Sequence, residues 1–254
     1  GTDLDDPLTI VCQVGQAVVY SHRSITGHKT NEDALGVFEW GDGKLLLAIA
    51  DGVGGLPGGA AAARRVLETL HKPPAGEHED PIVYLLDKAN DSILQDISMG
   101  ATTLSAALIQ NKRFTGYHAG DSTTLVVGQR GRVKFQSVCH SPVGIAQARG
   151  ELSERAALFH PQRHLLSNML GDEAFWVERS DCYELATFDT IVIASDGLWD
   201  NFFCDEIIEI VCQGALVQAG RRLAHSARQR MLTAEDNVPS KPDDLSFVLY
   251  RPHT

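Results

Sequence analysis

The sequence has no long apolar run, no closely spaced cysteine pair and no excess of basic residues, and each absence excludes a class of protein. Its 254 residues contain no uncharged apolar stretch of 18 or more, so we expect no membrane-spanning helix. The five cysteines are odd in number and form no C-x-x-C pair, which argues against a disulfide framework or a zinc ribbon. This cysteine usage is typical of a reducing compartment, so we expect a cytoplasmic protein.

Basic side chains are outnumbered by acidic ones. The 22 lysines and arginines against 33 aspartates and glutamates give a formal net charge of −11. A nucleic-acid binder presents a net basic face, so the composition predicts no nucleic-acid partner. The acidic beginning of the chain, at Asp3, Asp5 and Asp6, also lacks the basic and then apolar pattern of a secretory leader. The charge leaves two interpretations open, an ordinary solvated surface or a group of aspartates around a cation.

Three common motifs of nucleotide-binding proteins and hydrolases are also missing. Residues 52–58 are rich in glycine, but a G-x-G-x-x-G frame begun at Gly52 ends at Pro57, and no G-x-x-x-x-G-K-[ST] sequence occurs. The G-x-S-x-G sequence of α/β-hydrolases is absent. A phosphate-binding loop and a nucleophilic serine of that type are therefore disfavoured.

Apolar patterning predicts a mixture of strands and helices. Strand-like runs occur at residues 8–20 (interrupted at Gly15), 34–38, 44–50, 102–110, 113–118, 122–127, 133–138, 190–195 and 245–250. Helical spacing of apolar residues occurs over 59–70, 82–97, 207–212 and 216–227, and Asp80-Pro81 supplies an N-cap and a first-turn proline for the second helix. Helices covering a core of strands predict an α+β fold rather than strict βαβ alternation. Without repeats or a compositional break, we expect one domain over residues 1–254.

Acidic residues stand where several predicted strands begin or end. Asp51-Gly52 follows the run at 44–50, and Asp196-Gly197 follows the run at 190–195. The other acidic sites of this kind are Glu32-Asp33, Asp121 and Asp243-Asp244. Any one of them is ordinarily a turn residue, but together they form an oxygen-rich set that suits Mg²⁺ or Mn²⁺ better than zinc. Two such ions bind a phosphoryl group and activate a bridging water, so the residues suggest a metal-dependent hydrolase.

Six short motifs follow one another along about residues 20 to 251. In order they are residues 27–34 (GHKTNEDA), 50–55 (ADGVGG), 100–104 (GATTL), 120–122 (GDS), 195–200 (SDGLWD) and 243–246 (DDLS). Together they resemble the successive motifs of the metal-dependent protein phosphatases (the PPM, or type 2C, family), in particular its compact bacterial members. Residues 160–164 and 170–172 resemble a further bacterial segment. Each motif alone is weak evidence, and their common order carries the resemblance.

The resemblance implies a four-layer αββα fold, in which pairs of helices flank a central antiparallel β-sandwich, with a flap at about residues 139–158. It also implies hydrolysis of phosphoserine and phosphothreonine by a water that bridges two Mn²⁺ or Mg²⁺ ions, without a covalent phosphoenzyme. The partners would be phosphoprotein substrates and an opposing serine/threonine kinase. We further expect a monomer.

The motifs also imply the residues of the site. By position, Asp51 would bridge both ions and act in catalysis together with Asp196. Asp196 and Asp243 would complete the first ion site, while Glu32 and the carbonyl of Gly52 would hold the second ion.

Further acidic residues have implied roles. Asp121, together with Asp196, would match a third and weaker metal site of bacterial members. Asp33 and Asp244 would lie behind the ligands and support them.

One departure from the family pattern bears on phosphate binding. The phosphate-gripping arginine, four residues before the motif glutamate, is replaced by His28, which is only partly charged near neutral pH and makes no bidentate fork. We expect weaker phosphate binding, with Lys29 or Arg23 as possible substitutes. The departure keeps an alternative open, a pseudophosphatase or sensor module that binds a partner. Metal-dependent hydrolysis of small phosphates or nucleotides on the same scaffold is a third interpretation.

Overall fold

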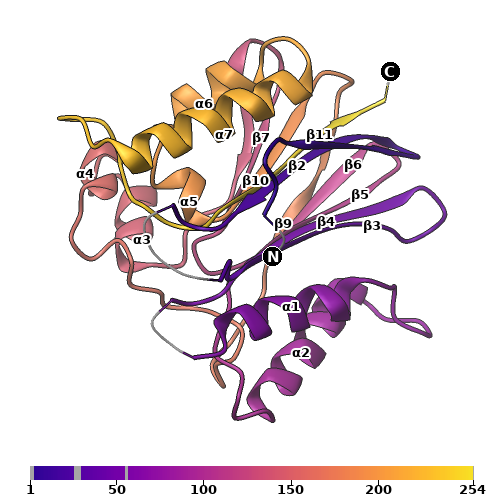
Figure 1. Cartoon of the computed structure of the whole chain (residues 1–254). Helices are drawn as coiled ribbons and strands as arrows, with labels where there is room; N and C mark the ends of the chain where they lie inside the picture. Colours follow the sequence, from indigo (N-terminus) through magenta and orange to yellow (C-terminus); the bar gives the residue numbers. More distant parts are fainter. Residues whose placement is uncertain (1–2, 26–29, 55–56, 254) are drawn as a thin grey trace.

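Two antiparallel sheets form the centre of the structure, a computed structural model that describes residues 3–25, 30–54 and 57–253 (Figure 1). The six-stranded sheet has the order β1 (Leu8–Cys12), β2 (Gly15–His22), β11 (Leu245–Pro252), β10 (Thr190–Ala194), β7 (Thr123–Val127) and β8 (Val133–Gln136). The five-stranded sheet has the order β3 (Asp33–Glu39), β4 (Lys44–Asp51), β5 (Leu104–Gln110), β6 (Arg113–Ala119) and β9 (Glu178–Glu184).

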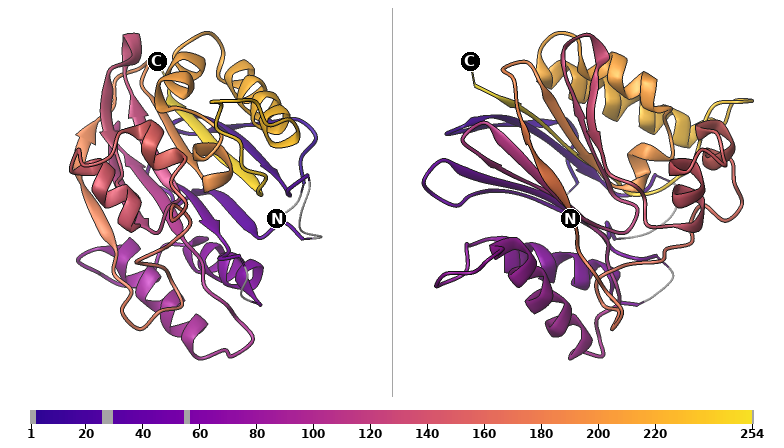
Figure 2. Two further views of the ribbon diagram at one scale, coloured as in Figure 1. Left: turned by 90° about the vertical axis from the view of Figure 1, so that its left-hand side faces the viewer. Right: turned by 180° about the vertical axis from the view of Figure 1, so that it is seen from behind.

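Helices cover the outer face of each sheet (Figures 1 and 2). Helices α1 (Gly59–Leu70) and α2 (Pro81–Leu94) pack on the five-stranded sheet, and α6 (Cys204–Val211) and α7 (Leu216–Leu232) pack on the six-stranded sheet. The shorter α3 (Pro142–Ala148), α4 (Glu154–Leu158) and α5 (Asp196–Trp199) and a 3₁₀ turn (Gln129–Gly131) complete the described elements. The layers are helix, sheet, sheet and helix, which confirms the predicted αββα fold. No helix of the described residues is long and apolar enough to cross a bilayer.

The continuous apolar runs are explained by burial on both faces of a strand. In β4, Leu45, Leu47 and Ile49 lie in the core between the sheets, while the alternate residues Leu46 and Ala48 face α1 and α2. Strand β10 divides its side chains in the same way between the sandwich core and the α6–α7 layer. An antiparallel sheet covered on both faces removes the polar alternation that marks a half-exposed strand. β4 ends at Asp51, and β10 ends two residues before Asp196.

Three sequence expectations are corrected by the structure. Residues 8–20 form a hairpin rather than one interrupted strand, because Cys12 pairs with Gly15 across a tight turn. The second helix ends at Leu94, before a turn capped by Asp96, and the side chain of Ile97 is fully exposed. Strand β9 was not predicted, because its residues are mostly polar and exposed at a sheet edge, where charge protects against further pairing. The helix predicted at residues 59–70 is found with the same bounds, and the other predicted elements are found with shifted ends. The short helices α3, α4 and α5 were not predicted.

Candidate metal centre

The predicted acidic residues meet at one end of the sandwich. A cavity of about 280 Å³ is lined by the proposed ligands Glu32, Asp51, Gly52, Asp121, Asp196 and Asp243, and also by Asp244. Asp33 lies buried beside it, opposite Asp51 in the β3–β4 register. His28 and Lys29 lie outside the described residues. The structure thus brings together the acids that the sequence places at five separate strand junctions.

The backbone around Asp51 is held from two sides. Its carbonyl oxygen accepts hydrogen bonds from the Thr103 backbone N–H (2.8 Å) and from the Thr102 hydroxyl (2.8 Å). Its own N–H donates to the Thr103 hydroxyl (3.2 Å), and the next N–H, of Gly52, donates to the Glu32 carbonyl (3.3 Å). A Cβ on Gly52 would lie 2.5 Å from the backbone carbonyl carbon of Gly59, the first residue of α1. Only glycine lets the helix start so close to the cavity.

Asp244 joins the beginning of β11 to the segment that carries Glu32. One carboxylate oxygen of Asp244 accepts the Ser24 N–H (2.7 Å), and the other accepts the Glu32 N–H (2.6 Å). Asp33 accepts the hydroxyl of Ser195, the residue before Asp196, at 2.8 Å. These two buried acids therefore connect the loops of both sheets, as the predicted supporting role requires.

Burial and mutual repulsion make the carboxylates hard to ionise without a cation. Burial, followed by the charges of Asp33, Asp196, Asp121 and Asp243, raises the pKa of Asp51 well above its usual range. Burial and Asp196 likewise raise the pKa of Asp121 to about 8 and that of Asp243 to about 6.

Asp33 shows the same effect. Burial and Asp244 raise its pKa to about 7, and its Oδ1 atom accepts no hydrogen bond within the described residues. An all-oxygen set with an unsatisfied buried acceptor fits Mg²⁺ or Mn²⁺, because these ions take carboxylate oxygens and keep some of their waters.

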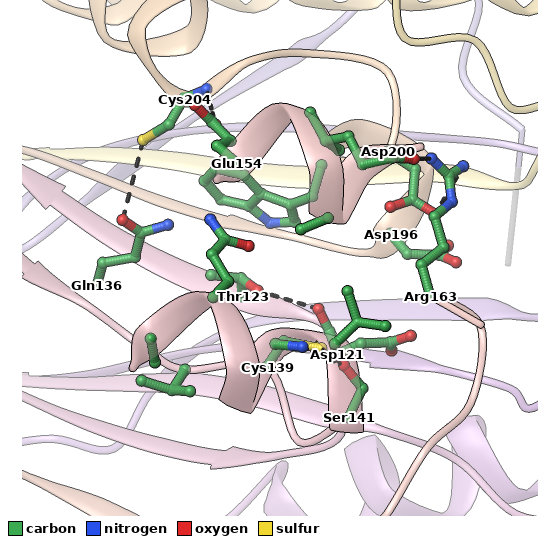
Figure 3. A pocket seen from close by; sticks show the side chains of 18 of the residues that line it. Asp121, Thr123, Gln136, Cys139, Ser141, Glu154, Arg163, Asp196, Asp200 and Cys204 are labelled. Carbon is green, nitrogen blue, oxygen red and sulfur yellow. Dashed lines mark hydrogen bonds and ion pairs between the residues drawn. The ribbon is translucent and has the colours of Figure 1, made fainter. Parts of the chain in front are cut away.

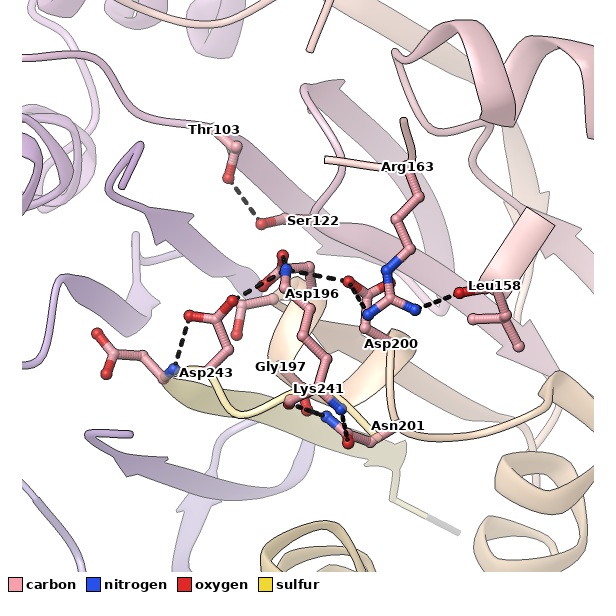
Figure 4. A network of polar contacts seen from close by, with 12 residues as sticks. Thr103, Ser122, Leu158, Arg163, Asp196, Gly197, Asp200, Asn201, Lys241 and Asp243 are labelled. Atoms are coloured by element: carbon pink, nitrogen blue, oxygen red, sulfur yellow. Dashed lines mark hydrogen bonds and ion pairs between the residues drawn. The ribbon is translucent and has the colours of Figure 1, made fainter. Parts of the chain in front are cut away.

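One charged residue that lines the cavity, Lys241, was not singled out by the sequence reasoning. The ammonium group of Lys241 forms ion pairs with Asp196, with Asp200 (3.0 Å) and with Asp243 (2.9 Å) (Figure 4). Arg163 contacts the same Asp200 carboxylate at 3.1 Å. The only sequence signal is a lysine two residues before Asp243, inside a stretch that reads as a loop.

A second cavity, of about 290 Å³, adjoins the acidic one and shares Asp121 and Asp196 with it (Figure 3). Its other walls come from α3 and α4, which lie in the predicted flap, and from Trp199 and Phe202. Its position next to the acidic cluster suits contact with the residues that flank a reacting group. The segment predicted as a flap, residues 139–158, therefore contains two short helices that line a half-apolar cavity.

A third cluster lies behind the Asp121 loop. His118, His140 and Glu178 place ligand-type atoms within 4.8 Å of one another. Both histidines are buried, their rings are 4.1 Å apart, and neither ring nitrogen of His118 is hydrogen-bonded within the described residues.

The hydrogen bonds of His140 show whether this cluster is suited to bind a metal ion. Its Nδ1 faces two donors, the Asn168 amide at 2.9 Å and the Gly120 N–H at 3.3 Å, and the Asn168 amide is fixed by both backbone groups of Trp176. Nδ1 therefore accepts, and the ring proton lies on Nε2, which donates to Glu178 at 2.9 Å. A metal ion would need the lone pair of Nε2. The geometry thus favours a hydrogen-bonded group that supports the Asp121 loop.

His118 gives a testable pH dependence. Burial and the neighbouring His140 lower its pKa to about 3, whereas the unfolded value is near 6.5. Below about pH 6.5 the unfolded chain binds the extra proton, so His118 lowers stability by up to about 1.4 kcal/mol per pH unit as pH falls. We expect His118→Gln to lose this part of the slope in urea unfolding of the metal-free protein between pH 7.5 and 5.

The carboxylates of the cavity titrate in both proteins, so the difference between them isolates His118. His225→Gln, at an exposed position on α7, is the control and is expected to follow the wild-type slope. A wild-type slope in His118→Gln would contradict a buried neutral imidazole.

Comparison with known proteins identifies similar protein phosphatases. The family model described as "Protein phosphatase 2C" matches residues 21–235. The chain is 29% identical over 182 residues to the serine/threonine phosphatase stp of Listeria welshimeri, covering 66% of this chain and 72% of that protein. It is 28% identical over 222 residues to the serine/threonine protein phosphatase PstP of Mycobacterium tuberculosis, covering 82% of this chain and 41% of that protein.

Solved structures share the fold. The Mycobacterium tuberculosis serine/threonine phosphatase PstP/Ppp superimposes with a TM-score of 0.78 at 23% identity, covering 95% of this chain and 100% of that one. The catalytic domain of PstP in complex with two manganese ions gives a TM-score of 0.73 at 22% identity, covering 95% and 99%. At these identities the likeness establishes the architecture.

Proposed function

Because the chain belongs to the protein phosphatase 2C family, we propose that it is a metal-dependent phosphatase that hydrolyses phosphoserine and phosphothreonine in proteins. The observation that carries the proposal is the convergence of Asp51, Asp196 and Asp243 on one cavity. A pseudophosphatase would be free to lose these acids, since a binding surface has no use for a costly group of buried carboxylates. Their retention favours the active enzyme over the binding module.

The cavity suits two Mn²⁺ or Mg²⁺ ions. Asp51 is proposed to bridge them, with Asp196 and Asp243 on the first, and Glu32 and the Gly52 carbonyl on the second. When bound, the ions supply an activated water and neutralise charge on the phosphoryl oxygens. The hydrogen bonds to the Asp51 backbone carbonyl fix the main chain from which this side chain enters the cavity, so little backbone reorganisation is needed during the reaction.

Two further roles remain proposals. Asp121, with Asp196, is proposed to hold a third, weaker ion, supported by their shared place between the two cavities. His28 is proposed to meet the phosphate less firmly than arginine would.

The cellular setting is proposed on the same basis. The partners would be phosphoprotein substrates and an opposing serine/threonine kinase, and the enzyme would act in the cytoplasm as a monomer. We treat residues 1–254 as one catalytic domain, with residues 139–158 as its flap. The half-apolar cavity beneath α3 and α4 supports a peptide substrate over a small free phosphate, because it offers a place for flanking side chains.

The function is tested by hydrolysis of a phosphothreonine peptide and of p-nitrophenyl phosphate with Mn²⁺, Mg²⁺ or EDTA. We expect turnover of both substrates with either ion, a higher kcat/KM for the peptide, and none in EDTA. Activity that persists in EDTA would exclude the metal mechanism. Absence of turnover with every ion would favour the binding module, and a preference for the small phosphate would favour the third interpretation.

A further inference from the structure

Lys241 places a positive charge in the wall of the acidic cavity. Its Nζ atom lies 2.9 Å from Asp243 Oδ2 and 3.0 Å from Asp200 Oδ2, and it also pairs with Asp196 Oδ2 (Figure 4). Only 25% of its side chain is exposed. An alkyl ammonium group within ion-pair distance of three carboxylates is a cation at physiological pH.

The backbone of Lys241 is fixed to the segment that carries two of its partners. The side-chain amide of buried Asn201 accepts the Lys241 N–H at 2.9 Å and donates to the Lys241 carbonyl at 2.9 Å. The same amide nitrogen donates to the Gly197 carbonyl at 2.9 Å. Lys241 is thus anchored beside α5, and only its flexible side chain is free to leave the carboxylates. A side chain that moves while its backbone stays in place needs no change of fold.

Two of these carboxylates, Asp196 and Asp243, are the acids that the proposed function assigns to the first ion. A divalent ion at these oxygens and an ammonium group within hydrogen-bond distance of the same oxygens would repel each other strongly in a half-buried site. We propose that Lys241 is a built-in cation that neutralises the first metal position of the metal-free protein and must leave it when the ion enters. The lysine thereby raises the metal concentration at which the site fills. This inference rests on the proposed function.

The apparent metal affinity would then reflect the difference between two interaction free energies, that of the metal ion with these carboxylates and that of the lysine with the same carboxylates. The metal-free fold gains stability from the lysine, and the ion must displace it. This arrangement lets the metal-free protein carry its acidic cluster without the full repulsion between the carboxylates.

The test compares Lys241→Met with wild type by isothermal titration of Mn²⁺ into metal-free protein. Methionine keeps the length of the stem and removes the charge. We expect Mn²⁺ to bind at least about tenfold more tightly, since close charge pairs are commonly worth that much or more. The melting temperature of the metal-free variant should fall, and its rise on adding Mn²⁺ should exceed that of wild type. Unchanged or weaker Mn²⁺ binding would overturn the proposal.

Lys134→Met is a matched control. Lys134 has 28% of its side chain exposed and pairs with the buried Asp189, which does not line the acidic cavity. We expect this variant to lose stability in the metal-free state without any change in Mn²⁺ affinity. Equal tightening in both variants would show a general effect of removing a lysine and would also overturn the proposal.

A measurement on wild type does not depend on how a variant folds. Reductive methylation followed by mass spectrometry reports the reactivity of each lysine. Lys241 should be modified slowly in metal-free protein and several-fold faster with saturating Mg²⁺, while Lys134 serves as the internal reference. Equal rates with and without Mg²⁺ would reject the displacement.

The two proposals fail in different ways. If the enzyme is active but Lys241→Met binds Mn²⁺ with unchanged affinity, only the proposal that Lys241 competes with the metal ion is rejected. If Lys241→Met binds Mn²⁺ more tightly than wild type, but the wild-type protein hydrolyses neither substrate with any ion, only the phosphatase function is rejected.

Discussion

Replacing Asp51 by asparagine is expected to reduce kcat by about a thousandfold or more, on both the phosphopeptide and p-nitrophenyl phosphate. Its carboxylate lies among four others, and each of them contributes to raising its pKa. This central position makes it the proposed bridge, and losing preorganised charge stabilisation alone typically costs a factor of about 10²–10³. Asparagine keeps the shape and removes the charge, so both ion positions should be weakened.

The stability of Asp51→Asn should change in the opposite direction to its activity. Removing one of several repelling carboxylates should raise the melting temperature of the metal-free protein, while the extra stability gained on adding Mn²⁺ should largely disappear. A folding defect would instead lower the metal-free value. Asp181→Asn, on the exposed edge strand β9, is the control and should behave as wild type. Normal Mn²⁺ stabilisation of Asp51→Asn would contradict the bridging role.

Gly52→Ala is expected to damage both stability and metal binding. The added Cβ would lie 2.5 Å from the Gly59 carbonyl carbon, 2.8 Å from its oxygen and 2.9 Å from the Ala60 nitrogen. These are backbone atoms at the start of α1, so a rotamer change gives no relief. Overpacking of this kind costs about 1–3 kcal/mol, and the shift should also move the Gly52 carbonyl away from the second ion. Urea unfolding in EDTA and titration with Mn²⁺ measure the two effects.

Gly54→Ala is a stringent control because it lies two residues away in the same loop. Apart from its chain neighbours, no atom of the described residues would lie within 4 Å of a Cβ there. We expect its free energy of unfolding to stay within about 0.5 kcal/mol of wild type, as for most unconstrained surface substitutions. Equal losses in the two variants would mean that the loop needs glycine for flexibility, and the packing argument would be wrong.

The central strands and their acids were predictable from sequence because one physical cause produces both signals. β4 and β10 are buried on both faces, so their apolar runs are nearly continuous, and they stop at Ala50, one residue before Asp51, and at Ala194, two residues before Asp196. Where each run stops, the chain reaches the acidic cavity and polar residues replace apolar ones. The motif order then indicates which of these ends meet.

Lys241 and β9 were not predictable by the same means. Lys241 acquires its role from contacts with Asp196 and Asp200, about 40 positions earlier in the chain, and no periodicity marks such a contact. β9 pairs with β6 along one side and leaves the other side to solvent, so its mostly polar sequence carries no apolar alternation. In both cases the information lies in tertiary proximity rather than in local pattern.

The position of β11 has a consequence for synthesis on the ribosome. This strand comes after every other described element, yet it lies inside the six-stranded sheet between β2 and β10, and Asp243 and Asp244 immediately precede it. An emerging chain can make β4 and Asp51 early, but it cannot assemble the acidic cavity until β11 inserts. We therefore expect a nascent chain that lacks β11 to have no phosphatase activity.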